Sequence, residues 1–132
     1  MTVVIDSSAV VAGLIDDGSD GEWARARMRS EPAAAPGHML VEVSNVLRRQ
    51  VLSGALSRDA AALAHADLLE LSVTTFGFES LATRVWALHP TVTAYDAAYV
   101  ALAEQLGVAL LTLDRRLTRA SGPTCSFLLP PE

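Results

Sequence analysis

Two short apolar segments of this 132-residue chain each end in an aspartate. The first, "VVID", spans Val3 to Asp6, and the second, "VALLTLD", spans Val108 to Asp114. Both are almost wholly aliphatic, which is typical of buried strands in a parallel sheet and not of half-exposed strands. Because the carboxyl ends of parallel strands meet at the edge where such sheets bind ligands, we expect Asp6 and Asp114 to project at that edge.

The rest of the chain is filled by segments with helical or strand-like patterns. Apolar periodicity, capping residues and terminal glycines predict helices over residues 8–18, 38–54, 56–71, 79–90 and 93–107. Ser7 or Ser8 is expected near the N-cap of the first helix. A purely structural interpretation of Asp6 is a strand-end or helix-capping acid, whose charge the helix dipole would favour. Residues 72–76 and 124–130 are predicted strands, and residues 31–38 are a predicted loop with at most a very short strand.

This alternation of strands and helices predicts the fold class. We expect an α/β protein, a three-layer α/β/α sandwich with a mainly parallel central sheet. The chain length suits a single domain over residues 1–132, and a hydrophobic content of 51% is far from that of a disordered chain.

The charged residues exclude several classes of function. The formal net charge is −5 and the chain contains no lysine, so all of its basic residues are arginines. A P-loop is excluded because it needs a lysine, and the overall field of an acidic chain is a poor attractant for nucleic acid. Without an apolar membrane span or a basic leader, a cytoplasmic protein with no membrane partner is expected.

Asp96 lies in a segment that has little room for a charge. The helix over residues 93–107 is apolar on nearly every side, so we expect it to be largely buried. Thr93 and Asp96 fit the capping-box pattern, which offers a purely structural reason for the aspartate. The alternative is that the fold needs a carboxylate at a cleft, and the helix pattern alone leaves both interpretations open.

Glu42 lies at the border of the apolar stripe of the helix over residues 38–54. It either pairs with Arg49 in solvent or leans into a cleft. His38 is one turn before Glu42, and we expect it to be a loop or helix-start residue and not a ligand. Arg115 and Arg116 directly follow Asp114 and are candidates for holding phosphates.

Carboxylates gathered at one edge need compensation. Two carboxylates about 4 Å apart repel by about 4 kcal/mol at an effective dielectric constant near 20. With no lysine, the compensating charge is an arginine, a shared proton or a metal cation. Oxygen ligands with few histidines suit Mg²⁺ or Mn²⁺.

Four motifs, in order, resemble a known family. "VVIDSSAVVAGL", "LVEVSNVLRR", "TAYDAAYVALAEQLG" and "LLTLDRRL" are similar to the successive motifs of PIN-domain ribonucleases, and they span nearly the whole chain. The short length without appended domains resembles VapC, the toxin of VapBC toxin–antitoxin pairs. The resemblance implies a ribonuclease that depends on Mg²⁺ or Mn²⁺ and acts on RNA of the tRNA or rRNA class.

The resemblance also implies roles for particular residues. Its acidic quartet corresponds to Asp6, Glu42, Asp96 and Asp114. It implies that the three aspartates ligate metal while Glu42 completes the shell or orients the attacking water. It further implies that Thr112 supports the site and that Ser7 and Asn45 lie beside the acids.

The partners implied by the resemblance are a cognate VapB-type antitoxin and a second copy of the chain in a homodimer. A phospho-receiver domain, the first rival, needs a lysine that this chain lacks. A haloacid-dehalogenase-like phosphatase needs D-x-D after its first strand, where this chain has "DSS". The remaining alternative is a non-catalytic PIN-like protein-binding module.

Overall fold

The central feature of the fold is one sheet of five short parallel strands, seen in a computed structural model that describes residues 2–132. The strands are β1 (Val3–Ile5), β2 (Ala33–Pro36), β3 (Val73–Phe76), β4 (Leu110–Leu111) and β5 (Phe127–Leu128). Their order across the sheet is β3-β2-β1-β4-β5, and each neighbouring pair runs parallel. The predicted parallel sheet is therefore confirmed.

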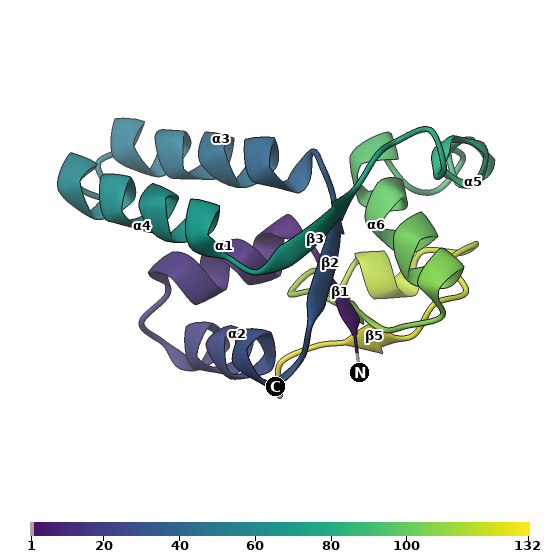
Figure 1. Ribbon diagram of the computed structural model, residues 1–132, viewed down its shortest axis with the longest axis horizontal. Coiled ribbons are helices and arrows are strands. Elements are labelled where there is room, and N and C mark those ends of the chain that lie inside the picture. The colour runs from purple at the N-terminus through teal and green to yellow at the C-terminus, as the bar shows by residue number, and fades with distance from the viewer. Residues whose placement is uncertain (1) are drawn as a thin grey trace.

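Helices cover both faces of this sheet. They are α1 (Ser7–Ile15), α2 (Ser19–Ser30), α3 (Met39–Leu52), α4 (Arg58–Glu70), α5 (Ala82–Ala87), α6 (Ala94–Leu106) and the 3₁₀ turn η1 (Leu117–Arg119). Figure 1 shows α1 to α4 on one side of the strands and α5 and α6 on the other. The three-layer α/β/α architecture follows the prediction.

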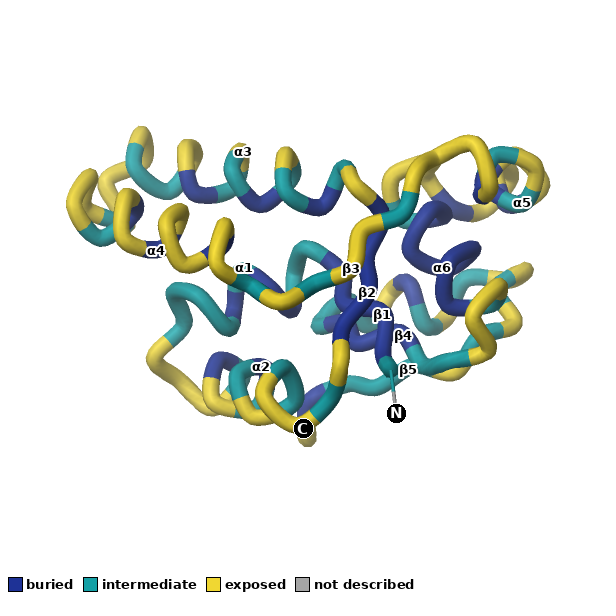
Figure 2. Tube along the Cα trace, in the orientation of Figure 1, coloured by how far each residue is buried: buried dark blue, intermediate teal, exposed yellow. Residues whose placement is uncertain are grey.

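Helix α6 is the most deeply buried helix in Figure 2, where it is dark blue along most of its length. Every residue from Ala97 to Ala103 is buried, as its apolar sequence predicts. The helix packs on β1, β2 and β4, and it ends at Gly107, whose φ of 68° is the left-handed conformation expected of a glycine at that position. Its first turn is thereby held at the carboxyl edge of the sheet.

One helix was missed by the sequence-based prediction. Helix α2 was not predicted because only Gly21 and Ala24 are buried on it. The very short strand allowed within residues 31–38 is β2, a fully buried strand beside β1, although its alanines have little intrinsic strand preference. Ser7 and Ser8 lie in the first turn of α1, next to the N-cap as expected, and the N-cap itself is Asp6.

No helix among residues 2–132 is long and apolar enough to cross a membrane.

Candidate active site

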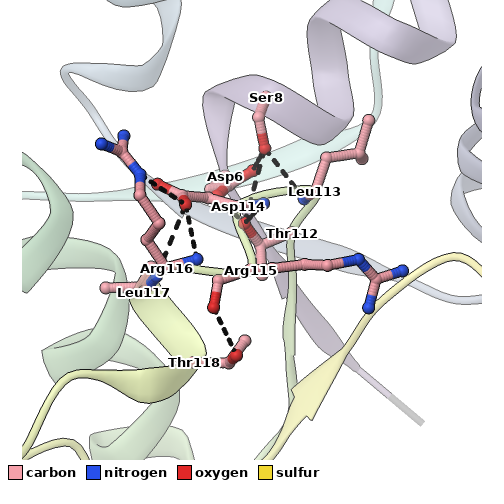
Figure 3. Close-up of polar contacts among 9 residues, drawn as sticks. All are labelled: Asp6, Ser8, Thr112, Leu113, Asp114, Arg115, Arg116, Leu117 and Thr118. Atoms are coloured by element: carbon pink, nitrogen blue, oxygen red, sulfur yellow. Dashed lines mark hydrogen bonds and ion pairs between the residues drawn. The ribbon is translucent and has the colours of Figure 1, made fainter.

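Asp6 is the most buried acid of the site, with 5% of its surface exposed. It follows β1 directly and caps α1, because its Oδ1 accepts a hydrogen bond from the backbone N–H of Ala9 at 3.0 Å. The same oxygen accepts one from the Ser8 hydroxyl at 2.6 Å, and Oδ2 accepts one from the Thr112 hydroxyl (Figure 3). Both oxygens of Asp6 are therefore held by neutral donors.

The charge of Asp6 is poorly compensated. Burial raises the pKa of Asp6 from 3.8 to about 6, and the charge of Asp96 acts in the same direction. The hydrogen bonds from Ser8, Thr112 and Ala9 lower this pKa but do not overcome burial. None of the ion pairs within residues 2–132 includes Asp6.

The two neighbouring strand ends are tied together beside Asp6. The Ser8 hydroxyl accepts a hydrogen bond from the N–H of Leu113 at 3.0 Å, and the Thr112 hydroxyl accepts one from the N–H of Asp114 at 3.0 Å (Figure 3). The loop after β4 is thereby fastened to the first turn of α1. Thr112, named from the sequence as a supporting residue, is fully buried and donates a hydrogen bond to Asp6.

Asp114 lies on this fastened loop and is partly exposed, with 29% of its side chain accessible. Its Oδ1 accepts hydrogen bonds from the N–H groups of Arg116 at 3.0 Å and Leu117 at 3.4 Å, just before and at the start of η1. The Arg116 Nε lies 3.6 Å from the same oxygen, but that arginine side chain is 90% exposed. Oδ1 of Asp114 thus has a local structural role.

Asp96 lies in the first turn of α6. Its backbone N–H donates to the Thr93 hydroxyl at 3.3 Å, so Thr93 is the N-cap that the capping-box pattern predicts. Burial raises the pKa of Asp96, and the charges of Asp114 and Glu42 raise it further. Asp96 therefore lies close enough to Asp114 and Glu42 for their charges to act on its carboxylate.

Glu42 lies in the first turn of α3, directly after β2. Its Oε1 accepts a hydrogen bond from the Tyr99 hydroxyl at 2.5 Å and lies 3.4 Å from Nε2 of His38. Arg49 is exposed and forms no ion pair with Glu42, so the solvated Glu42–Arg49 pair is not formed. Glu42 leans toward the buried helix α6 instead.

Three other predicted residues lie less centrally. Asn45 is exposed on α3 and makes no side-chain hydrogen bond within residues 2–132. Ser7 begins α1 and contacts Tyr99, whose pKa is raised by burial and by Glu42 despite a smaller opposing effect of Ser7. Arg115 turns away from the acids, because it donates to the carbonyl of Pro130 at 2.7 Å and lies 3.5 Å from the carboxylate of Glu132.

The sequence, compared with protein families, matches the PIN domain over residues 3–123. The chain belongs to the PIN-domain family. It is 38% identical over 118 residues to Ribonuclease VapC3 of Mycobacterium tuberculosis, an alignment that covers 89% of this chain and 86% of the relative. The resemblance stated from the motifs is therefore confirmed.

Solved structures agree with this assignment at the level of the fold. VapC20 of M. tuberculosis, a sarcin-ricin loop cleaving toxin, has a TM-score of 0.69 and 19% identity, covering 89% of this chain and 93% of that one. VapBC2 of Rickettsia felis, bound to a DNA fragment from its promoter, has a TM-score of 0.71 and 11% identity, covering 99% and 100%.

Two residues of this PIN domain were missed as site residues by sequence reasoning. Ser8 holds Asp6, whereas Ser7 was named, because neighbouring serines after a strand cannot be ranked without the helix geometry. Tyr99 holds Glu42 but lies among apolar residues and was taken as core. His38 was set aside as a helix-start residue, although its spacing of one turn before Glu42 was a usable signal.

The donor set of this PIN domain fits a divalent cation in chemistry. As the side chains stand, no three His, Cys, Asp or Glu residues within the described part of the chain are arranged to hold a metal ion. The acids are nevertheless all oxygen donors, and Asp6 and Asp96 both have raised pKa values. A cation would offset the like charge that raises them, and hard oxygen donors suit Mg²⁺ or Mn²⁺.

Proposed function

We propose that this PIN domain is the ribonuclease toxin of a type II toxin–antitoxin pair, and that it cleaves RNA at the acidic edge of its sheet in the presence of Mg²⁺ or Mn²⁺. One observation carries the proposal. Acids from segments far apart in the sequence act on one another electrostatically. Asp6 and Asp96 have raised pKa values and form no ion pair within residues 2–132, and the charge of Arg116 only partly offsets the effect at Asp96. Such uncompensated carboxylates are typical of functional sites.

Each residue of the quartet has a proposed role. Asp6, Asp96 and Asp114 would hold the cation. Bound there, it would lower the pKa of a water molecule and offset negative charge on the scissile phosphate. Glu42 would orient the attacking water and accept its proton, for which it needs a fixed carboxylate. Ser8 and Thr112 keep the oxygens of Asp6 oriented, so the site is largely ordered in advance.

RNA docking would depend on local positive charge, because the whole chain carries −5. Arg116 is the best placed candidate, since its exposed guanidinium lies beside Asp114. Arg115 is a weaker candidate because its guanidinium is engaged with the C-terminal segment. We propose an RNA loop of the rRNA or tRNA class as substrate, and the sarcin-ricin loop named for VapC20 supports the rRNA alternative.

The partners belong to the same proposal. The chain is a VapC-type protein, and the VapBC2 neighbour supports a VapB-type antitoxin as its partner. We propose in addition that residues 1–132 form one domain and that two copies form a homodimer. Size-exclusion chromatography with light scattering would test the homodimer, and a monomeric mass at micromolar concentration would contradict it.

The decisive experiment is cleavage of total RNA by the purified chain, free of partner, in Mn²⁺ or Mg²⁺. We expect discrete cuts that disappear in EDTA and in Asp6→Asn. Glu104→Gln is the matched control, because Glu104 is a partly buried acid away from the site and should keep the activity. A folded wild-type protein that binds Mn²⁺ but cuts no cellular RNA, including rRNA and tRNA, would contradict the proposal and favour a non-catalytic binding module.

A further inference from the structure

Tyr99 combines a fully buried ring with a polar contact to the site. Only 1% of its surface is exposed, and it lies on the rigid, buried face of α6. Its hydroxyl donates to Oε1 of Glu42 at 2.5 Å. Because a closely packed ring cannot turn freely, the position of this hydroxyl is set by the core of the protein. The hydrogen bond therefore fixes the Glu42 carboxylate relative to α6, the helix that also carries Asp96.

His38 approaches the same carboxylate oxygen from the start of α3. Its ring packs edge-on against Tyr99 at a centroid distance of 5.1 Å. Its Nε2 lies 3.4 Å from Oε1 of Glu42 and 3.2 Å from the carbonyl oxygen of Tyr95. Both neighbours of Nε2 are acceptors, so this nitrogen carries the proton, which it donates to the carbonyl of Tyr95. Oε1 of Glu42 therefore receives a hydrogen bond from Tyr99 and a longer polar contact from His38.

The second oxygen of Glu42 is in a different situation. Within residues 2–132, Oε2 accepts no hydrogen bond from the protein, while Oε1 is contacted by both Tyr99 and His38. A carboxylate held through one oxygen keeps the other available for a water or a ligand in a defined direction. A glutamate has three side-chain torsions, and without the Tyr99 hydrogen bond and the His38 contact it would sample several rotamers.

We infer that Tyr99 is a positioning residue for Glu42, with His38 in a second, weaker positioning role. The inference rests on the proposed ribonuclease function, because it assigns a purpose to the geometry of one of its acids. A purely structural alternative is that Glu42 only satisfies a buried tyrosine hydroxyl. The two alternatives differ in what the loss of that hydroxyl does to turnover.

The test compares Tyr99→Phe with Tyr95→Phe. These are the only tyrosines of the chain, both lie on α6, and each substitution removes one hydroxyl and keeps the ring. The Tyr95 side chain is exposed and its hydroxyl makes no hydrogen bond within the described residues. On an RNA oligonucleotide carrying the mapped cleavage site, we expect Tyr99→Phe to lower kcat by about tenfold to hundredfold with little change in KM, since it loses a hydrogen bond to a charged group. Tyr95→Phe should match the wild type.

Repeating the Tyr99→Phe substitution in a Glu42→Gln variant separates a positioning role of Tyr99 from an effect on stability. In Glu42→Gln, at raised protein concentration, Tyr99→Phe should cause little further loss of turnover if Tyr99 acts through Glu42. Equal losses in both backgrounds, or a wild-type kcat in Tyr99→Phe, would overturn the inference. If Tyr99→Phe does not fold, His38→Gln takes its place. We expect a loss of about threefold to tenfold that is again absent in Glu42→Gln, because the longer His38 contact is weaker.

Failure of the ribonuclease proposal would look different. In that case the wild type cuts no RNA, and crystal structures of the two tyrosine variants still test the positioning. Glu42 should leave its single position in Tyr99→Phe and keep it in Tyr95→Phe. An unmoved Glu42 in Tyr99→Phe would overturn the positioning role whatever the activity.

Discussion

Helix α6 carries an acid near each end, and the surroundings of the two acids shift their pKa values in opposite directions. Asp96, in the first turn, lies among other carboxylates, and burial together with the charges of Asp114 and Glu42 raises its pKa. Glu104, in the last turns, is 14% exposed and is met by the guanidinium of Arg84. One helix thus carries an uncompensated acid at one end and a compensated acid at the other.

At the Glu104 end, a set of hydrogen bonds joins α5, α6 and the C-terminal segment, and we call this set the Glu104 clasp. Arg84 donates to both oxygens of Glu104, at 2.6 and 3.1 Å, and the N–H of Thr124 donates at 2.7 Å. Arg84 also donates to the carbonyl of Gly122, which ties the C-terminal segment to α5 and α6. Burial alone would raise the pKa of Glu104, but the hydrogen bonds from Arg84 and Thr124 lower it below its ordinary value.

The comparison teaches that partial burial of an acid does not by itself mark a site. At Glu104 the protein supplies a cation, so the carboxylate stabilises the fold and has nothing left to bind. At Asp6 the protein supplies only neutral donors, and at Asp96 the charge of Arg116 lowers the pKa less than burial, Asp114 and Glu42 raise it, so both charges are available to a ligand. This difference leads to four predictions, ordered from the largest expected effect to the smallest.

The largest effect is expected at the uncompensated end of α6. Asp96→Asn should lower the rate of RNA cleavage by about a thousandfold or more, because a ligand of the cation is lost and each tenfold corresponds to about 1.4 kcal/mol. The fold should be unaffected, since the cap uses the hydroxyl of Thr93 and the backbone of Asp96. Asp59→Asn, in the first turn of α4, is the control and should retain full activity.

The second prediction concerns the pH dependence of stability. The pKa of Asp6 is about 6 in the fold against 3.8 ordinarily. A raised pKa means that its contribution to stability is complete below pH 3.8 and is lost as the pH rises through about 6. In EDTA at pH 8, Asp6→Asn should therefore raise the free energy of unfolding by up to about 3 kcal/mol. At pH 4 the two proteins should differ little.

Urea denaturation at the two pH values measures this difference. Asp17→Asn, which replaces an exposed acid, serves as the control and should change stability little at either pH. A destabilised Asp6→Asn at pH 8 would mean that the hydrogen bonds from Ser8 and Thr112 outweigh the burial of the charge. The carboxylates at the acidic edge would then be electrostatically compensated, as Glu104 is, and the contrast between the two ends of α6 would not hold.

The third prediction concerns the clasp. Glu104→Gln should lower the free energy of unfolding by about 1–2 kcal/mol, because it weakens charge-assisted hydrogen bonds. The loss is smaller than for a fully buried pair, since Arg84 is 38% exposed and solvent screens its charge. Nuclease activity well below the melting temperature should be unchanged. Thermal melts alongside RNA cleavage decide this, and a large loss of activity in a stable Glu104→Gln would show that the two ends of α6 are not independent.

The smallest effect is expected from Arg116, which lies at the acidic edge but is 90% exposed. Arg116→Gln should leave the melting temperature unchanged and weaken binding of single-stranded RNA modestly. If Arg116 neutralises one phosphate, the slope of log affinity against log salt concentration should fall by about 0.7. The exposed Arg48→Gln on α3 is the control, and an identical slope in both variants would remove Arg116 from the docking surface.

Much of the fold could be predicted because its signals are local. The aliphatic run before Asp6 and the apolar helix after Thr93 each contain enough residues of one kind to specify a buried strand and a buried helix. Strand β2 and helix α2 could not be predicted in this way. The alanines of β2 form a strand because β1 and β3 pair with them on both sides, and α2 packs through a buried glycine that leaves no apolar stripe.

The acids proposed for the site were all named from the sequence, as was Thr112, while two of the side chains that hold them were not. Asp6, Glu42, Asp96 and Asp114 follow strands or begin helices, and their motifs resemble those of PIN domains, so position along the chain was sufficient to propose them. Ser8 and Tyr99 were missed because their roles depend on contacts across the sheet and between helices. Such contacts have no local pattern.

The sequence by itself therefore determined which charges this protein has to accommodate, since an acidic chain without lysine can compensate a buried carboxylate only with arginine, one of its three histidines, a proton or a bound cation. Only the tertiary structure decided which acid is paired with an arginine and which is left among neutral donors and other acids. Packing of α5 against α6 brings Arg84 to Glu104, whereas the meeting of β1, β4, α3 and α6 brings further acids and hydroxyls to Asp6 and Asp96. The physical reason is that electrostatic compensation depends on distance in space, which the order of residues does not contain.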